Sequence, residues 1–303
     1  MVQLTQLQMK LSALLPDLEL RFEEPMHKHT SFRIGGGAEV MAFPKTAEEL
    51  SRLLKTSALL DLKPAILGAG TNVLAPDEGL RGLVICLKDC LSGMEQLDDR
   101  RVRVAAGVTM TRAAVYAANL GLSGMEFAHG IPGTVGGGIF MNAGAYGGEL
   151  KDICESVEVM DFGGYIRTVP ASEMDFSYRH SMLEEVPGIV VSVVFSLTPM
   201  EPEEIRSKMK ELQMKRSASQ PLDLPSAGSA FKRPVGAYAA ALIDEAGLKG
   251  YTVGGAAISA KHAGFAVNLG GATADDIRNL LQQVSDIVFE KTGIRLEPEV
   301  RIW

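Results

Sequence analysis

Cysteine is scarce in this chain, and the few that occur form no recognisable pattern. The three cysteines, Cys86, Cys90 and Cys154, are too few for a disulfide framework, and the Cys86–Cys90 pair lacks the second half of a zinc site. Histidine shows no metal-binding spacing either, since His27 and His29 stand alone. We therefore expect free, buried thiols in a reducing compartment and no bound metal.

Long hydrophobic runs and an excess of basic residues are also missing. No apolar run approaches the roughly 20 residues that span a bilayer, and residues 1–20 lack the basic start and long apolar core of a signal peptide. Acidic residues outnumber basic ones by 37 to 30, and the formal net charge of −7 argues against nucleic-acid binding. An anionic small substrate is still compatible with this charge, because a few local arginines can outweigh the overall field. These absences predict a cytoplasmic protein with no membrane insertion and no nucleic-acid partner.

The remaining composition is that of a globular protein of two or three domains. The chain has 303 residues, of which 46% are hydrophobic and 22% charged. Hydrophobic periodicity and capping residues predict helices at residues 1–16, from a Thr46 capping box onward, and at 109–120, 203–216, 235–246 and 274–291. Strands are predicted at residues 65–67, 82–87, 102–106, 189–197 and 296–301. Because the strands cluster and do not alternate regularly with helices, an α+β fold is expected.

Two glycine-rich loops are the first sign of a ligand. Residues 68–73 follow a predicted strand, but the third glycine of a dinucleotide fingerprint would fall at Val73, so a simple tight turn is the alternative. Residues 130–137 form a second loop with many backbone N–H groups and few side chains, which can wrap a pyrophosphate. Two separate loops suit a long dinucleotide such as FAD, and the Walker pattern for a mononucleotide is absent.

Three segments far apart in the chain add polar residues that folding does not require. They are residues 178–181 (Tyr-Arg-His-Ser), 226–232 (Ser-Ala-Gly-Ser-Ala-Phe-Lys) and 296–301 (Leu-Glu-Pro-Glu-Val-Arg). Taken alone, Arg179 is explained by a surface ion pair, Ser229 by a turn and Glu299 by a solvated strand. Together with the glycine loops, the arginine, serine and glutamate indicate an enzyme that acts on an anionic substrate.

The ordered set of motifs resembles the UDP-N-acetylenolpyruvoylglucosamine reductase (UDP-N-acetylmuramate dehydrogenase) family over almost the whole chain. The matching segments are residues 29–36, 68–74, 130–137, 142–147, 178–181, 226–232 and 296–301. Residues 29–36 and the end of the chain just after the last motif are similar to the shorter, second type of the family. Two positions depart from the usual pattern: Thr71 replaces a serine but keeps the hydroxyl, and Ala230 is often a bulkier residue.

The resemblance implies a fold and a set of binding residues. It implies an FAD-binding fold of the vanillyl-alcohol-oxidase/PCMH kind, with its first subdomain in residues 1–80 and its second in 81–200, and a substrate-binding domain in 201–303 whose last strand returns toward the flavin. It implies non-covalent FAD bound by Arg33, Gly68, Gly70, Thr71, Asn72, Val73, Gly130, Ile131, Pro132, Gly133, Gly136, Gly137, Asn142, Gly144 and Ala145. It implies a UDP-sugar bound by Tyr178, Arg216, Lys232 and His262. NADPH is implied as co-substrate, and a monomer is expected.

The family's reaction gives the catalytic residues their implied roles. NADPH reduces FAD and leaves, and the enolpyruvyl ether of UDP-N-acetyl-3-O-(1-carboxyvinyl)glucosamine then takes the hydride, which yields UDP-N-acetylmuramate for peptidoglycan synthesis. Negative charge develops beside the substrate carboxylate, so a cation and an acid near its oxygens lower the barrier. By motif match, Arg179 is that cation, Glu299 is a protonated hydrogen-bond donor, and Ser229 gives the proton to the substrate carbon.

Two other functions fit parts of this pattern. Another flavin enzyme of the same fold would oxidise a hydroxy acid or alcohol, often with covalently attached flavin, and His129 beside the second loop is the candidate attachment point. A non-catalytic nucleotide-sensing module would keep the glycine loops, but it has no need of Arg179, Ser229 and Glu299 together.

Overall fold

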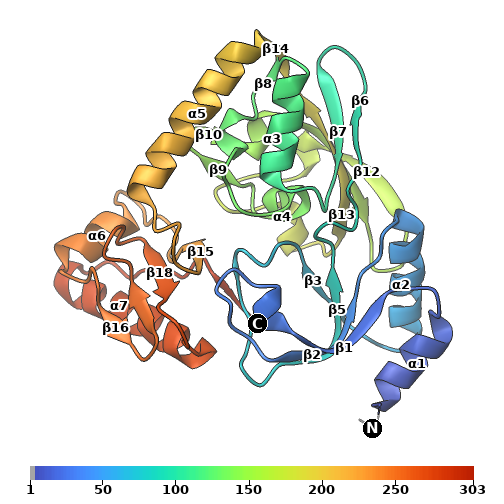
Figure 1. Cartoon of the computed structure of the whole chain (residues 1–303), viewed down its shortest axis with the longest axis horizontal. Helices are drawn as coiled ribbons and strands as arrows, with labels where there is room; N and C mark the ends of the chain where they lie inside the picture. The colour runs from blue at the N-terminus through green and yellow to red at the C-terminus, as the bar shows by residue number, and fades with distance from the viewer. Residues whose placement is uncertain (1–3) are drawn as a thin grey trace. The chain divides into compact units, whose positions relative to one another are not determined.

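The computed structural model describes residues 4–303, which fold into two compact units (Figure 1). Unit 1 contains Met1–Phe22, Val40–Ala69 and Gly82–Lys215, and unit 2 contains Glu23–Glu39, Gly70–Arg81 and Arg216–Trp303. The chain therefore passes between the units several times, and each unit combines segments that are distant in sequence. Residues 1–3 of the predicted N-terminal helix lie outside the described residues. The division at residues 80 and 200 stays a prediction.

A five-stranded antiparallel sheet forms the centre of unit 1. Its strand order is β12 (Ile166–Pro170), β11 (Cys154–Met160), β13 (Ile189–Ser196), β7 (Arg101–Ala105) and β6 (Met94–Gln96). Strand β13 is buried along almost its whole length, and its Val193 and Phe195 are fully buried with Val157 of β11. The β-branched run that predicted this strand is thus explained by burial on both faces of the sheet.

Helices α3 (Met110–Asn119) and α4 (Val135–Phe140) contribute to the same core. The alanines of α3, among them Ala113 and Ala117, are buried, which allows close approach of the helix to its neighbours. Thr109 caps α3 and Thr134 caps α4. The long helix α5 (Pro202–Ser219), gold in Figure 1, adds Ile205 and Met209 to this core.

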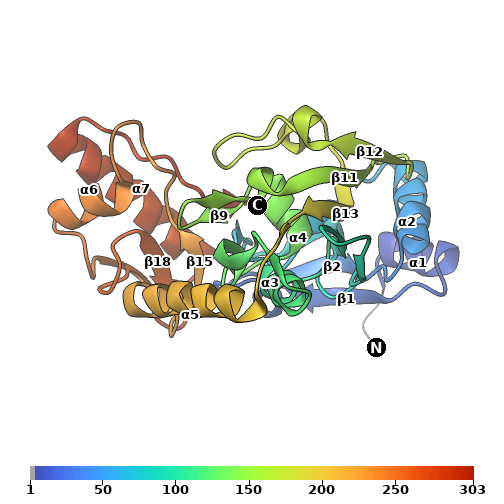
Figure 2. The same cartoon turned by 90° about the horizontal axis from the view of Figure 1, so that it is seen from above.

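A second sheet has the strand order β1 (Leu20–Pro25), β2 (Gly37–Ala42), β5 (Leu80–Cys86) and β3 (Ala65–Leu67). Strands β3 and β5 are parallel. Helices α1 (Gln6–Leu14) and α2 (Ala47–Leu59) lie side by side and share a buried cluster with this sheet, including Leu11, Leu50 and Ile85 (Figure 2). The boundary between the units passes through β1, β2 and β5.

Unit 2 contains a four-stranded antiparallel sheet and two helices. The strand order is β15 (Ser226–Ser229), β18 (Phe265–Asn268), β17 (Ala256–Ile258) and β16 (Thr252–Val253). Helices α6 (Ala239–Glu245) and α7 (Ala274–Thr292) share its core, to which Phe32 and Leu74 also belong. Strand β19 (Arg301–Ile302) pairs in parallel with β4 (Val73–Leu74).

Short elements complete the described chain. Strand β8 (Leu122–Ser123) pairs with β14 (Thr198–Pro199), and β9 (Gly144–Ala145) pairs with β10 (Gly148–Glu149). The 3-10 turns are η1 (Met26–Lys28), η2 (Glu126–Ala128), η3 (Leu150–Asp152), η4 (Ala171–Glu173) and η5 (Met182–Glu184).

Three of the predicted elements are corrected by the structure. The helix predicted at residues 235–246 begins only at Ala239, because Gly236 is left-handed (φ 74°) and interrupts the helical path. Residues 296–301 form no continuous strand, since Pro298 makes only an isolated bridge to Phe231 and regular pairing starts at Arg301. The Thr46 capping box is open, because the Glu49 carboxylate accepts from Lys45 N–H and not from the cap residue.

The capping box of α7 gives a testable contribution to stability. Thr273 Oγ1 accepts from Asp276 N–H at 3.0 Å, and Asp276 Oδ2 accepts from Thr273 N–H at 3.0 Å. We expect Thr273→Ala to lower the free energy of unfolding of unit 2 by about 1 kcal/mol, because a helix N–H loses its partner. Urea denaturation followed by circular dichroism measures this loss. Thr273→Ser keeps the oxygen and should unfold near the wild-type midpoint; equal losses in both variants would contradict the capping role.

Candidate active site

The two predicted glycine loops meet at Gly68 and Thr134 within unit 1. A Cβ on Gly68 would lie 2.6 Å from Thr134 Oγ1, and a Cβ on Gly136 would lie 2.9 Å from the Cβ of Ala106. Gly136 N–H also donates to Ala106 O at 2.9 Å, so this backbone is drawn against its neighbour. No larger residue fits these two positions without movement. Backbone that approaches this closely, with no intervening side chains, fits the diphosphate of a dinucleotide.

Asn142 connects the segment after α4 to the turn that carries Arg179. Its side chain is fully buried, and Nδ2 donates to Ser177 O at 2.9 Å and to Glu149 Oε2 at 3.0 Å. Ser181, also fully buried, donates from Oγ to Phe140 O at 2.8 Å. Two sequence motifs, residues 142–147 and 178–181, therefore form one hydrogen-bonded assembly in unit 1.

The Arg179 turn is tight and strained. Ser177 and His180 exchange backbone hydrogen bonds of 3.3 Å in both directions, which places Tyr178 and Arg179 at the tip. Arg179 is left-handed (φ 58°), a conformation that costs a residue with a side chain roughly 1–3 kcal/mol. The guanidinium lies 5.0 Å from the centre of the Tyr178 ring. The pKa of Glu149 lies below its usual value, because Lys151 and Asn142 donate hydrogen bonds to its carboxylate and Arg179 adds a positive charge.

In unit 2, the residues before β19 join two other motifs. Glu299 N–H donates to Ala230 O at 2.9 Å, next to Ser229, and Lys232 N–H donates to Glu297 O at 2.8 Å. Asn72 Nδ2 donates to Glu299 O at 3.1 Å. The backbone carbonyl of Asn72 accepts from the N–H of Arg301, the first residue of β19, at 3.0 Å. Ser229 at the end of β15, the Asn72 loop and Glu299 are thereby held in one network. Ser229 is exposed and Glu299 is half-buried.

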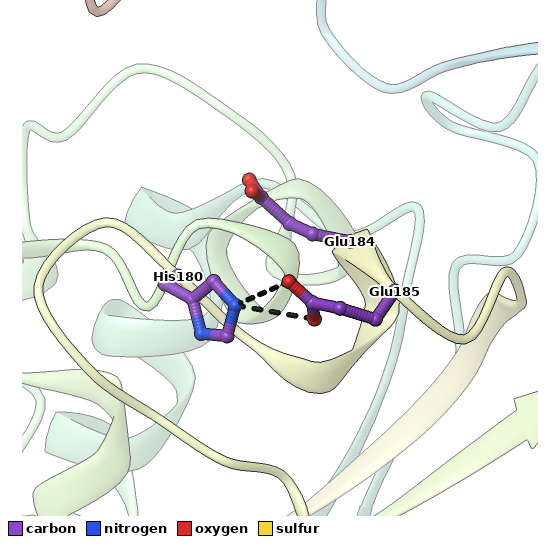
Figure 3. A group of neighbouring side chains, drawn as sticks. All are labelled: His180, Glu184 and Glu185. Carbon is purple, nitrogen blue, oxygen red and sulfur yellow. Dashed lines mark hydrogen bonds and ion pairs between the residues drawn. The ribbon is translucent and has the colours of Figure 1, made fainter.

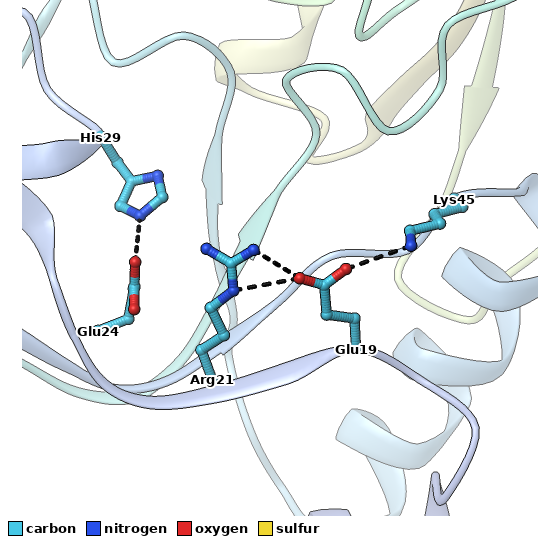
Figure 4. Close-up of polar contacts among 5 residues, drawn as sticks. All are labelled: Glu19, Arg21, Glu24, His29 and Lys45. Carbon is cyan, nitrogen blue, oxygen red and sulfur yellow. Dashed lines mark hydrogen bonds and ion pairs between the residues drawn. The ribbon is translucent and has the colours of Figure 1, made fainter.

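Residues 29–36 pack against the same loop. Ser31 N–H donates to Gly70 O at 3.0 Å, and a Cβ on Gly70 would lie 2.0 Å from His29 O. His29 itself bonds through Nε2 to Glu24 Oε1 at 2.8 Å, and both side chains are largely buried (Figure 4). His29 thus has a carboxylate partner that fixes the segment beside Gly70. Arg33 is exposed and left-handed (φ 57°).

Figure 4 also shows a separate ion-pair group in unit 1. Arg21 Nη2 lies 2.6 Å from Glu19 Oε1, and Lys45 Nζ lies 3.3 Å from Glu19 Oε2. The Arg21 guanidinium, which lies 4.3 Å from the centre of the Phe43 ring, holds the pKa of Glu19 below its usual value. These exposed contacts support strand β1 and carry no sign of chemistry.

Comparison with known proteins agrees with this arrangement of motifs. A family profile described as an FAD binding domain matches residues 38–170, and one described as the C-terminal domain of UDP-N-acetylenolpyruvoylglucosamine reductase matches residues 220–303. A UDP-N-acetylenolpyruvoylglucosamine reductase from Caldanaerobacter subterraneus subsp. tengcongensis is 46% identical over 293 residues, which cover 97% of this chain and 96% of the relative. This chain belongs to the UDP-N-acetylenolpyruvoylglucosamine reductase family. A relative of the same name from Agathobacter rectalis is 46% identical over 299 residues, 95% of each chain.

A solved reductase structure extends the family likeness to the fold. The crystal structure of the enzyme from Thermus caldophilus has a TM-score of 0.79 at 37% identity, covering 94% of this chain and 98% of that one. The predicted resemblance, the α+β fold with an FAD-binding domain, and the assignment as a flavin-dependent oxidoreductase are confirmed. Membership in the reductase family favours this enzyme over the other flavin oxidoreductase, with His129 as its attachment point, and over the sensing module.

The family's expected nucleotide-sugar residues are divided between the units. Arg216, Lys232 and His262 belong to unit 2 and Tyr178 to unit 1. Arg216 is buried near the end of α5 with Nη1 3.4 Å from Gln220 Oε1, and Lys232 Nζ pairs with Glu297 Oε1 at 2.5 Å. Burial lowers the pKa of His262, whose Nδ1 accepts from Gly264 N–H at 3.1 Å. The neutral ring therefore carries its proton on Nε2 and can donate to an oxygen.

One polar group went unrecognised in the sequence. His180, Glu184 and Glu185 place potential ligand atoms within 4.8 Å of one another (Figure 3). In the sequence, a histidine followed four and five residues later by glutamates is the signal that could have indicated this group. His180 Nε2 already donates to Glu185 at 3.0 and 3.2 Å, so we interpret the group as an ion pair and assign it no metal.

The cysteines have the state that their spacing predicts. All three are buried and free. Burial raises the pKa of Cys90 and of Cys154 to about 12 and also raises the pKa of Cys86. These thiols stay protonated at neutral pH and lack nucleophilic reactivity. Within residues 4–303, no helix is both long and apolar enough to cross a membrane.

Proposed function

We propose that this protein catalyses the NADPH-dependent, FAD-mediated reduction of UDP-N-acetyl-3-O-(1-carboxyvinyl)glucosamine to UDP-N-acetylmuramate, a step of peptidoglycan precursor synthesis. The observation that carries the proposal is the 46% identity to a named reductase over 97% of the chain. Apart from residues 130–137, the motifs of the resemblance also contribute to two hydrogen-bonded assemblies, one in each unit.

The glycine loops fit an FAD diphosphate. The residues that would hold FAD in this proposal are Arg33, Gly68, Gly70, Thr71, Asn72, Val73, Gly130, Ile131, Pro132, Gly133, Gly136, Gly137, Asn142, Gly144 and Ala145. The match of residues 38–170 to an FAD binding domain supports this assignment for the positions within that range, and close packing accounts for glycine at Gly68 and Gly136. When bound, FAD supplies hydride transfer from NADPH to the enolpyruvyl group.

The chain's own polar residues then stabilise and complete the reduction. Arg179 attracts the substrate carboxylate, where negative charge grows as the neighbouring double bond is reduced. Glu299, in its protonated form, donates a hydrogen bond to the same carboxylate. Ser229 Oγ gives its proton to the substrate carbon that becomes carbanionic, since so basic a carbon can deprotonate an alcohol. The exposure of Ser229 supports this role, because its hydroxyl is accessible to a substrate.

The expected monomer and cytoplasmic location complete the proposal. Three buried, free cysteines support a reducing compartment, in which thiols persist. Sedimentation velocity at micromolar concentration checks the monomer.

A spectroscopic cycle tests the proposed function. The purified protein should be yellow, lose its flavin absorbance with NADPH under anaerobic conditions, and regain it when the enolpyruvyl UDP-sugar is added. Bleaching of the oxidised flavin by a simple hydroxy acid or alcohol, with no recovery of the reduced flavin on addition of the UDP-sugar, would replace the proposal with the other flavin enzyme. A colourless protein that binds nucleotide would support the sensing module.

A further inference from the structure

The strained Arg179 turn needs an external support. A left-handed residue with a side chain persists only where its surroundings fix it, and Asp175 in the same segment is also left-handed (φ 47°). The backbone contacts across the turn, 3.3 Å each between Ser177 and His180, are long. Asn142 Nδ2 holds Ser177 O at 2.9 Å on the side where the chain enters the turn. Ser181 Oγ donates to Phe140 O at 2.8 Å where the chain leaves the turn, so a restraint that ties the two sides of the turn to each other would complete the support.

The His180 ring supplies this restraint by bridging the two sides of the turn. Its Nδ1 lies 3.0 Å from Asp175 O, before the turn, and its Nε2 lies 3.0 Å from Glu185 Oε1, after the turn (Figure 3). The carbonyl and the carboxylate are both acceptors, so both ring nitrogens must donate. A neutral imidazole has only one N–H, and it would leave one of these contacts without a proton. The geometry thus requires the imidazolium.

We propose that His180 is a positioning residue for Arg179: its doubly protonated ring ties Asp175 to Glu185 across the base of the turn and holds the guanidinium where a substrate carboxylate binds. This inference rests on the proposed function, because it takes Arg179 as the residue that binds the carboxylate. His180 itself contacts neither substrate nor cofactor in this account.

The charges around the ring agree with this role. Glu185 and Glu184 of the segment after the turn, and the carbonyl of Asp175 before it, favour the charged ring, and the Glu185 hydrogen bond contributes most to raising the pKa of His180 above 6.5. Partial burial of the ring acts in the opposite direction, because it disfavours the charged form. Because the pKa of His180 is raised, the imidazolium support is complete below pH 6.5 and is lost as the pH rises through the raised value.

Glutamine variants of the two neighbouring glutamates separate positioning from general charge effects. Glu185→Gln removes the charged acceptor of the ring, whereas Glu184→Gln removes one negative charge and leaves the His180–Glu185 contact. At pH 7, where the wild-type ring is expected to be doubly protonated, reoxidation of the reduced flavin by the enolpyruvyl UDP-sugar should slow about tenfold in Glu185→Gln and in His180→Gln, because misplacement of a binding group by a fraction of an ångström is costly. Glu184→Gln keeps the His180–Glu185 contact and should therefore slow reoxidation clearly less than Glu185→Gln does.

The pH profile gives the signature that a purely structural role would not produce. In wild type the reoxidation rate should fall as the pH rises through the raised pKa of His180. In Glu185→Gln this fall should move to lower pH, in Glu184→Gln it should shift little, and in His180→Gln it should disappear. Flavin reduction by NADPH should be unchanged in all three variants.

Histidine ¹⁵N NMR of the holoenzyme provides a readout that does not depend on turnover. The His180 signals, identified by their loss in His180→Gln, should show both nitrogens protonated at pH 7 and a lower titration midpoint in Glu185→Gln. A neutral His180 ring at pH 7, or equal reoxidation rates and pH profiles in Glu185→Gln and Glu184→Gln, would overturn the inference. If the wild-type flavin is not reoxidised by the UDP-sugar, the proposed function fails, and the NMR titration still decides whether the ring is doubly protonated.

Discussion

Replacing Ser229 with alanine should leave the reduction of the flavin by NADPH intact and slow its reoxidation by the enolpyruvyl substrate by roughly 10²–10⁴-fold, the usual contribution of a positioned proton donor. The proposed reaction needs a proton at the substrate carbon only after the substrate has been reduced, so the first half-reaction does not involve the hydroxyl. Ser229 ends strand β15 and is exposed, and the methyl group of alanine occupies less space than the hydroxymethyl group. The substitution therefore removes the proposed proton donor with little disturbance of packing. Anaerobic stopped-flow absorbance follows the two half-reactions separately.

Two further variants sharpen this test. Ser229→Cys offers a thiol proton in nearly the same place and should recover part of the reoxidation rate. Ser217→Ala, an exposed serine of α5, should leave both half-reactions at wild-type rates. Equal slowing of flavin reduction and reoxidation in Ser229→Ala would contradict proton donation and indicate a role in binding or in fold.

The elements that the sequence predicted well are those whose own residues carry the hydrophobic pattern or the cap that forms them. The strand at residues 65–67 has the predicted bounds, and α3 (Met110–Asn119) lies within the predicted 109–120, with Thr109 as its cap. Strand β13 follows from a β-branched run that is buried along its length. In each case the hydrophobic pattern and the capping residue agree with the tertiary contacts, so local reasoning suffices.

Elements that depend on distant partners were less predictable. The segment before β19 alternates like a strand, but Pro298 cannot donate, and the neighbouring amides bond to Ala230 and to residues of the 70–74 loop in an irregular order. Strand β1 was missed because its alternation is weak and it is stabilised by pairing within a sheet. No property of residues 20–25 alone specifies that pairing.

For the candidate site, the sequence predicted which residues belong to it but not which atoms those residues contact. Motif matching selected Asn142, Arg179 and Ser181, but nothing in the sequence indicates that Asn142 donates to Ser177 or that Ser181 donates to Phe140. The Glu185 partner of His180 lies outside every motif and was found only through the turn geometry. Side-chain partners across a turn depend on the backbone path, which a single sequence does not define.

Gly70→Ala should abolish most FAD binding while the related change Gly236→Ala leaves it intact. Both glycines are left-handed, with φ of 62° and 74°, so alanine is strained at either position by about 1–2 kcal/mol. They differ in their surroundings: a Cβ on Gly70 would lie 2.0 Å from His29 O and 2.9 Å from Thr30 Cα, whereas a Cβ on Gly236 meets no atom within 4 Å. Since the Gly70 neighbours are backbone atoms, the loop itself must move.

Movement of this loop should affect the cofactor more than the fold. Ser31 N–H donates to Gly70 O, and Asn72 two residues later bonds to Glu299, so displacement of Gly70 disturbs the proposed FAD contacts of Thr71 and Asn72 directly. A displacement that costs about 3 kcal/mol weakens binding by roughly a hundredfold. Flavin absorbance per mole of purified protein measures occupancy, and thermal unfolding of the FAD-free proteins measures the fold. We expect both apoproteins to unfold cooperatively, with Gly70→Ala at a somewhat lower temperature because of its backbone clash, and only Gly70→Ala to stay largely empty at FAD concentrations that saturate the wild type. Full occupancy in Gly70→Ala would contradict the role of the first glycine loop in holding the cofactor, because a Cβ at this position forces the loop away from His29 and Thr30.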